Sequence, residues 1–381
     1  MEEISLDNKR KIRTWALSQE ASKLQEEKSC GSRSSPLIDL ASNDYFGLSR
    51  HPKLIEAVSE TIKIEGVGSG SSQLLTGTRP INKRLEEKLA NWMNRESILL
   101  FPSGFQANIA AVNCLADRHT SVFADKLIHH SLLVGVKASG AKLYRFAHND
   151  LNQLEDKLID NDRKTLFNSP LIIVESLYSM EGTSPNLFEI KNLCEKYGAL
   201  LIIDEAHALG ILGDKGKGLS YKINEDYVIV SGTFGKAFGS GGAFLASNKK
   251  IREKLIQTSG AFRYTTGIAP PLCAGANAAI DLIDSNPAWG EELIQESAKW
   301  RKRFIEIGYK RPSGISHIIP LIIGDNKKSM HLQNKLEEDG ILCLAIRPPT
   351  VPEGTSRLRI VIRRSLPKFS LEKLIANLEI K

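Results

Sequence analysis

The chain has 381 residues, of which 41% are hydrophobic and 25% charged, and its formal net charge is +7. This composition excludes a disordered or fibrous protein and is typical of a globular chain with one large domain and a smaller one. The basic residues are interleaved with acids along the whole chain, so an anionic substrate explains the charge as well as a nucleic acid would.

Five cysteines lie far apart in the sequence, and no two of them form a C-x-x-C pair. This spacing fits neither a metal site nor a disulfide framework, so we expect no bound metal and a reducing environment. The first residues lack the apolar core of a signal peptide, and no later run is long enough to span a membrane. The sequence therefore predicts a cytoplasmic protein without a membrane segment.

The N-terminal part of the chain reads as an arm that leads into the main domain. Residues 1–24 predict an amphipathic helix, with Ile12 and Trp15 among its apolar positions, and a polar linker follows. We expect the arm and linker to occupy residues 1–38.

From residue 39 onward, short apolar runs alternate with helical patterns. Runs this apolar are typical of strands buried on both faces, so the pattern predicts an α/β fold with a mostly parallel sheet in a large domain, residues 39–271. Residues 272–381 predict a smaller α+β domain. The expected strands are residues 98–101, 121–124, 143–146, 171–174, 200–203, 227–230, 315–323, 341–346 and 357–362, and helices are expected to start at Pro52, Pro80, Ser103, Asp150, Pro185, Pro287 and Ser329.

Residues with reactive or polar side chains follow several of the predicted strands. In parallel sheets, ligands bind beyond the carboxyl ends of the strands. The residues expected at this edge are Ser103, Asp125, Glu175, Asp204 and Ser231.

A lysine lies in the middle of a glycine-rich loop after one of these strands. Residues 228–245 begin as an apolar run and continue into a loop with five glycines that surround Lys236. Packing beside Phe234 and Phe238 would remove water from the ammonium group and favour the free amine, which forms Schiff bases. Alternatively, the glycines only form a turn and Lys236 is solvated.

The same loop offers groups that bind phosphate. The hydroxyls of Ser231 and Thr233 and the glycine amides could hold a phosphate close to the amine, and pyridoxal phosphate requires both. A nucleotide phosphate loop is excluded, because Ala237 stands where that motif requires serine or threonine.

The run from Leu200 to His207 places Asp204 at the end of a buried strand. A buried carboxylate there requires a partner, and a protonated pyridine nitrogen is such a partner. His207 follows closely and could bond to the 3-hydroxyl of the same ring. The letters Asp-Glu-Ala-His also spell a helicase motif, which would make the chain a nucleic-acid-binding protein, but the phosphate loop that helicases need is missing.

Taken together, eight stretches resemble the α-oxoamine synthases, pyridoxal phosphate enzymes of fold type I, the aspartate aminotransferase-like fold. The resemblance extends over residues 42–364 and is strongest to the biotin-pathway members. The stretches are residues 42–49, 102–108, 125–132, 145–150, 179–182, 204–207, 233–239 and 347–352.

The resemblance implies a role for each matching residue. Lys236 would bind pyridoxal 5'-phosphate covalently, Asp204 would pair with its ring nitrogen, and His129 would stack on the ring, with neighbouring His130 as the alternative. The other cofactor-binding residues implied are His207 and Ser179 at the 3-hydroxyl and Gly104, Phe105 and Thr233 at the phosphate.

For the substrate, the resemblance implies that Asn43 and Arg359 bind the carboxylate of an amino acid, with Arg347 as a second cation. From the strand alone, Arg357 and Arg359 share a face and both could be solvated. The implied reaction is the decarboxylative condensation of L-alanine with a pimeloyl thioester, on coenzyme A or acyl carrier protein, by a cytoplasmic homodimer. The alternative is a sister enzyme that joins glycine to acetyl-, succinyl- or another acyl-coenzyme A.

Overall fold

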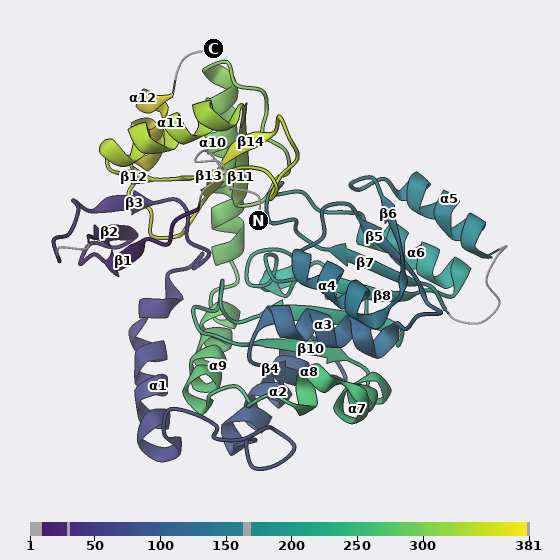
Figure 1. The fold of residues 1–381 in the computed structure, drawn as a ribbon. Coiled ribbons are helices and arrows are strands. Elements are labelled where there is room, and N and C mark those ends of the chain that lie inside the picture. Colours follow the sequence, from purple (N-terminus) through teal and green to yellow (C-terminus); the bar gives the residue numbers. More distant parts are fainter. Residues whose placement is uncertain (1–9, 29–30, 163–168, 379–381) are drawn as a thin grey trace, which may run out of the picture. The chain divides into compact units, whose positions relative to one another are not determined.

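The computed structural model describes residues 10–28, 31–162 and 169–378. The chain forms two compact units (Figure 1). The larger unit consists of Leu48–Ser179 and Ser184–Glu291, and the smaller unit consists of Met1–Gly47, Met180–Thr183 and Glu292–Lys381.

A seven-stranded sheet forms the centre of the larger unit. Its four neighbouring pairs from β9 to β6 are parallel, which confirms the predicted mostly parallel sheet, whereas β10 is antiparallel to both β9 and β4. The strands in order across the sheet are β4 (Ser97–Phe101), β10 (Ala243–Ser247), β9 (Val228–Thr233), β8 (Leu200–Asp204), β7 (Leu171–Glu175), β5 (Ser121–Asp125) and β6 (Lys142–Phe146).

The strands are apolar because helices cover the sheet. All residues of β4, β5, β7 and β10 are buried, so neither face of these strands is in contact with water. On one face, alternate strand residues such as Leu99 and Phe101 form a core cluster with four helices. These helices are α3 (Gly104–Leu115), α4 (His130–Ser139), α7 (Lys249–Thr258) and α8 (Gly260–Arg263).

Two of the remaining helices of the larger unit begin at the predicted prolines, Pro52 and Pro80, whereas the helix that begins at Pro270 was not predicted. Pro52, Pro80 and Pro270 each lie in the first turn of a helix. A backbone N–H at this position has no acceptor within the helix, so proline, which lacks the N–H, costs no hydrogen bond there. No helix in the described ranges has both the length and the apolar character needed to cross a bilayer. The helices are α1 (Pro52–Glu65), α2 (Pro80–Trp92), α5 (Leu151–Asp162), α6 (Leu187–Tyr197) and α9 (Pro270–Asp284), with the short 3-10 turns η2 (Leu48–Arg50) and η3 (Asp214–Gly216).

Two small sheets organise the smaller unit. One is antiparallel, in the order β11 (Ile318–Gly324), β14 (Ser356–Val361) and β13 (Leu344–Ile346). The other joins the N-terminal segment to residues from near the C-terminus, in the order β1 (Thr14–Leu17), β2 (Lys23–Glu27), β3 (Leu37–Asp39) and β12 (Ile341–Leu342). The helices of the C-terminal part of the chain are α10 (Trp289–Glu306), α11 (Asn326–Glu338) and α12 (Ser370–Asn377).

The predicted N-terminal helix is wrong for its described residues, 10–24. Here the chain forms the β1–β2 hairpin, with Trp15 opposite Glu26. Ile12, expected on the apolar side of the helix, is fully exposed. The hairpin is favoured because β2 also pairs with β3, so its backbone groups find partners in a sheet. Residues 1–9 lie outside the described residues.

Candidate active site

The parallel register of the large sheet brings three polar strand ends together. Glu175 lies opposite Asp204, and Asp204 lies opposite Ser231, on three neighbouring strands. Asp125, at the end of β5, instead accepts hydrogen bonds from the backbone of Leu127 and Asn149. The carboxyl edge of β7, β8 and β9 therefore forms the polar floor of a site.

A cavity of about 210 Å³ opens at this edge. Most of the cofactor residues implied by the sequence line this cavity, although they come from four separate stretches of the chain. Ser179 is half-buried in the loop after β7 and is not among the described lining residues. The lining residues are Gly104, Phe105, Asn108, His129, Glu175, Asp204, Ala206, His207, Ser231, Gly232, Thr233 and Lys236.

Asp204 is buried and held in place by two donors. The side-chain amide of Asn108 donates to its Oδ2 at 2.7 Å, and the backbone N–H of Ala206 donates to its Oδ1 at 2.9 Å. These two contacts fix the orientation of the Asp204 carboxylate, which lines the cavity. Asn108 was not among the predicted site residues, although it is the last residue of the stretch 102–108.

His129, and not His130, lines the cavity. His129 is the N-cap of α4, and its Nδ1 accepts from the backbone N–H of Ser131. Desolvation by the surrounding protein lowers the pKa of His129, and Lys236 and His130 act in the same direction while Asp204 opposes them. The imidazole is therefore biased toward its neutral form.

The loop that carries Lys236 is the connection of the β9–β10 hairpin. Thr233 pairs with Ala243 at its base, and the Thr233 hydroxyl donates to the carbonyl of Gly242 at 3.0 Å. Gly239 and Gly242 both have positive φ, and a Cβ on Gly239 would lie 2.3 Å from the backbone N of Ser49. Close backbone packing therefore fixes the path of the loop around the half-buried lysine.

Glu205, next to Asp204, is fully buried and does not line the cavity. Its carboxyl accepts from the hydroxyl of Ser176 and from the backbone N–H of Ser220, each at 2.6 Å. Burial raises the pKa of Glu205, although these hydrogen bonds act in the opposite direction. Glu205 thus holds the loop around Ser220 against the strand end that positions Asp204.

The residues of the cavity fit pyridoxal phosphate. Ser231 Oγ and Asn108 Oδ1 are buried and make no hydrogen bond to any described residue, so the cavity has polar capacity for a ligand. The first residues of α3, Gly104 and Phe105, offer backbone N–H groups at a helix N-terminus, a favourable place for a phosphate. Lys236 supplies an amine on the same lining.

In the smaller unit, the structure places the two arginines of β14 in different surroundings. Arg357 forms an ion pair with Glu181 at 3.0 Å, whereas Arg359 donates to Asn43 Oδ1 at 3.0 Å. Both arginines are buried, so they are not solvated side chains of an exposed strand face. Tyr45 lies beside Asn43, and burial raises the pKa of its hydroxyl to about 12.

Arg347 lines a second cavity of about 550 Å³ in the smaller unit. Arg10 and Lys11 lie on the same cavity, and its apolar wall includes Leu344 and Ile346. The cavity therefore combines an apolar wall with positive charge.

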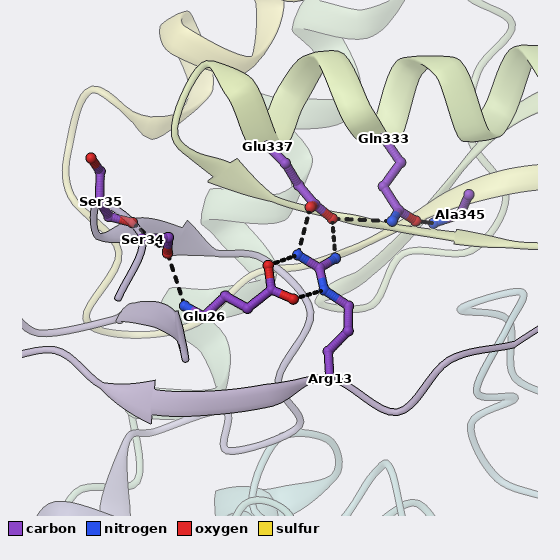
Figure 2. A network of polar contacts seen from close by, with 7 residues as sticks. All are labelled: Arg13, Glu26, Ser34, Ser35, Gln333, Glu337 and Ala345. Carbon is purple, nitrogen blue, oxygen red and sulfur yellow. Dashed lines mark hydrogen bonds and ion pairs between the residues drawn. The ribbon is translucent and has the colours of Figure 1, made fainter. Parts of the chain in front are cut away.

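Arg13 also reaches this cavity, but two carboxylates hold it. Its guanidinium donates to both carboxylate oxygens of Glu26, at 2.7 Å, and to both of Glu337, at 2.8 Å (Figure 2). These bonds raise the pKa of Arg13 and lower that of Glu26. Arg13 therefore joins the β1–β2 hairpin to α11.

The comparison with known proteins agrees with this architecture. Residues 35–378 match the aminotransferase class I and II family, and the chain belongs to this family of enzymes. Its fold is that of the fold-type I pyridoxal phosphate-dependent transferases, so Asp204-Glu205-Ala206-His207 is part of a transferase fold and not of a helicase.

Individual proteins similar to this chain include synthases and transferases of known name. The chain is 38% identical over 342 residues to the 8-amino-7-oxononanoate synthase of Saccharophagus degradans, covering 89% of this chain and 85% of the relative. The crystal structure of 8-amino-7-oxononanoate synthase from Francisella tularensis has a TM-score of 0.77 at 28% identity, covering 90% of this chain and 96% of the other. Sphingomonas wittichii serine palmitoyltransferase has a TM-score of 0.88 at 26% identity, covering 96% and 90%.

Proposed function

We propose that the protein is an 8-amino-7-oxononanoate synthase, which condenses L-alanine with a pimeloyl thioester and releases carbon dioxide. The observation that carries this proposal is the cavity in which Lys236, Asp204 and His129 meet, in a chain 38% identical to a synthase of that name. Pyridoxal 5'-phosphate is the proposed cofactor, and when bound it serves as an electron sink for the α-carbon of an amino acid.

Several lining residues, together with Ser179, have a proposed part in holding the cofactor. Asp204 would hold a proton on the ring nitrogen, and Lys236 Nζ would bind the cofactor and is the amine placed to move the α-proton of alanine. The ring of His129 covers one face of the cofactor, and His207 and Ser179 contact its 3-hydroxyl side. Gly104, Phe105 and Thr233 bind its phosphate, where the helix dipole of α3 adds attraction for an anion.

For the amino acid, we propose that Arg359 and Asn43 bind the carboxylate. Arg359 is held by a neutral amide, whereas Arg357 already has a carboxylate partner in Glu181. Glu181 already pairs with the guanidinium of Arg357, so Arg357 is less suited to bind a substrate carboxylate in two-point fashion. Arg359 is thus the better candidate of the two.

For the acyl group, the cavity around Arg347 supports a long chain that ends in a carboxylate. Leu344 and Ile346 can cover methylenes at ~0.8 kcal/mol per CH₂, and Arg10, Lys11 and Arg347 can attract the terminal charge. Acetyl and succinyl groups have too few methylenes to gain much from burial against Leu344 and Ile346. The thiol carrier is proposed to be coenzyme A or acyl carrier protein, and the enzyme is proposed to act as a cytoplasmic homodimer.

The test is a comparison of thiol release from matched substrate pairs. Alanine with pimeloyl thioester should react much faster than glycine with acetyl- or succinyl-coenzyme A, with the amino-oxononanoate detected by mass. Heptanoyl thioester, which has the same chain length without the terminal carboxylate, is the control for recognition of the charge. A preference for glycine, or for serine with a long-chain acyl thioester, would move the protein to a sister activity.

A further inference from the structure

A chain of hydrogen bonds joins the two ring-binding residues of the cavity beneath its surface. His129 Nδ1 lies 2.7 Å from Ser131 Oγ, and Asn108 Nδ2 lies 2.9 Å from the same Oγ and 2.7 Å from Asp204 Oδ2. Ser131 and Asn108 are both buried. Three elements contribute, because Asn108 belongs to α3, Ser131 to α4, and Asp204 ends β8.

The chemistry of these groups fixes the direction of the hydrogen bonds. A carboxylate only accepts, so the amide of Asn108 must turn its NH₂ group, and not its oxygen, toward Asp204. The second hydrogen of the same NH₂ group then points to Ser131 Oγ. Asn108 thus donates at both of its short contacts.

The contact between Asn108 and Ser131 also bears on the hydrogen bond between Ser131 Oγ and His129 Nδ1. Because Ser131 Oγ accepts from Asn108, its single hydrogen is available for His129 Nδ1, and the backbone N–H of Ser131 also donates to Nδ1 at 3.3 Å. The backbone N–H of Ser131 makes Nδ1 an acceptor, and we assign the Ser131 hydroxyl as a second donor to the same nitrogen. The proton of the neutral ring is then on Nε2.

We propose that Asn108 is a positioning residue that, through Ser131, holds His129 as the neutral Nε2–H tautomer while it fixes the Asp204 carboxylate. The consequence for the cofactor rests on the proposed function: the residue that covers the ring is uncharged, so Asp204 faces the protonated ring nitrogen without a competing cation on His129. The lowered pKa of His129 agrees with this arrangement.

The test reads the tautomer directly, by long-range ¹H–¹⁵N correlation on the cofactor-loaded protein labelled with ¹⁵N-histidine. The chain has 8 histidines, and a His129→Gln variant identifies the resonances of His129. At neutral pH we expect Nδ1 to give the shift of an unprotonated nitrogen and Nε2 that of a protonated one. A wild-type ring protonated on Nδ1, or on both nitrogens, would overturn the proposal.

Two variants separate this role from a merely structural one. Asn108→Asp replaces the donor with an acceptor and adds a negative charge, so the pKa of His129 should rise by about 1 unit. Ser131→Ala removes the O–H donor but leaves the contact of Asn108 with Asp204, so part of the His129 population should move its proton to Nδ1. An unchanged His129 spectrum in the folded Ser131→Ala protein contradicts the proposal, even if Asn108→Asp does not fold.

The NMR spectrum tests the positioning role of Asn108, and the thiol-release assay tests the proposed function, so either one can be wrong without the other. If the tautomer is as expected but alanine and pimeloyl thioester do not react, the proposed function is wrong and the positioning role stands. If the reaction proceeds with His129 in another tautomer, the positioning role is wrong and the proposed function stands.

Discussion

Arg357 and Glu181 form a nearly buried ion pair, with 3.0 Å between Nη1 and Oε1 and only 6% and 13% of the two side chains exposed. Two residues further along β14, Arg359 meets the amide of Asn43 instead. The two arginines share a strand and a side-chain face, yet a carboxylate contacts Arg357 and a side-chain amide contacts Arg359.

This difference predicts that alanine substitution affects stability at Arg357 and substrate binding at Arg359. Arg357→Ala leaves Glu181 buried without its partner and should lower the free energy of unfolding by about 3 kcal/mol, measured by denaturant titration. Arg359→Ala should raise the KM for alanine far more than Arg357→Ala does, because it removes the proposed carboxylate ligand. Equal KM values for the two variants would mean that Arg359 is not that ligand.

Replacement of Lys236 should abolish the covalent link to the cofactor. After borohydride reduction, wild-type protein should retain one cofactor mass, whereas Lys236→Ala should retain none, because no other amine on the described cavity lining can form the bond. Lys302→Ala is the control, since the Lys302 side chain is 79% exposed. A cofactor adduct on the Lys236→Ala protein would refute this role.

Asp204→Asn should allow the cofactor to bind but slow proton removal from alanine. A neutral amide cannot hold the ring proton as a carboxylate does, and a loss of ~3 kcal/mol corresponds to a rate on the order of 10²-fold lower. Exchange of the alanine α-deuterium, followed by NMR, measures this step without the acyl substrate. Asp281→Asn, at an exposed carboxylate, should exchange at the wild-type rate.

Glu205 predicts a specific pH dependence of stability. Its pKa in the folded protein is raised by burial, so the folded state binds more protons than the unfolded state between the ordinary pKa of glutamate and the raised value. The free energy of unfolding should therefore fall as pH increases through this window. Glu205→Gln should remove this slope, whereas Glu60→Gln at an exposed position should keep it. Parallel pH profiles for wild type and Glu205→Gln would contradict the prediction.

The contacts of Arg13 predict a salt-sensitive attachment of the N-terminal hairpin. Arg13→Gln leaves Glu26 and Glu337 close together without the intervening cation and should destabilise the hairpin by about 1–3 kcal/mol, seen as faster amide exchange in β1 and β2. Added salt should reduce the difference from wild type. Arg303→Gln, which removes a similar two-carboxylate contact at an exposed site, should have little effect.

The sequence predicted the elements whose signals are local. The apolar runs that end in Glu175 and Asp204 are strands buried on both faces, and the carboxyl ends of these strands do line a cavity. Pro52 and Pro80 begin helices because proline at a first turn loses no hydrogen bond. The fold class and the strand-end residues of the cavity thus follow from short stretches of sequence, whereas His129, Gly104 and Phe105 were expected only from the resemblance to the α-oxoamine synthases.

Features that depend on distant partners were not predicted. Ala243–Ser247 is a strand because β4, far away in sequence, pairs with it, and nothing in the glycine-rich run before it indicates this. The N-terminal hairpin depends on β3 in the same way. Asn108 and Ser131 look like ordinary helix residues in the sequence, and their polar contacts exist only because α3 and α4 pack together next to Asp204.

If Lys236 binds the cofactor as proposed, the hairpin around it also affects how quickly its amine can act a second time. β9 and β10 hold both ends of the loop by main-chain pairing, so the backbone on either side of Lys236 is anchored in the sheet. An amine displaced from a ligand in the cavity therefore remains at a high effective molarity beside it, and its return is a unimolecular event. We expect each cycle to end by recapture on the same nitrogen, independent of enzyme concentration and of free amines in solution.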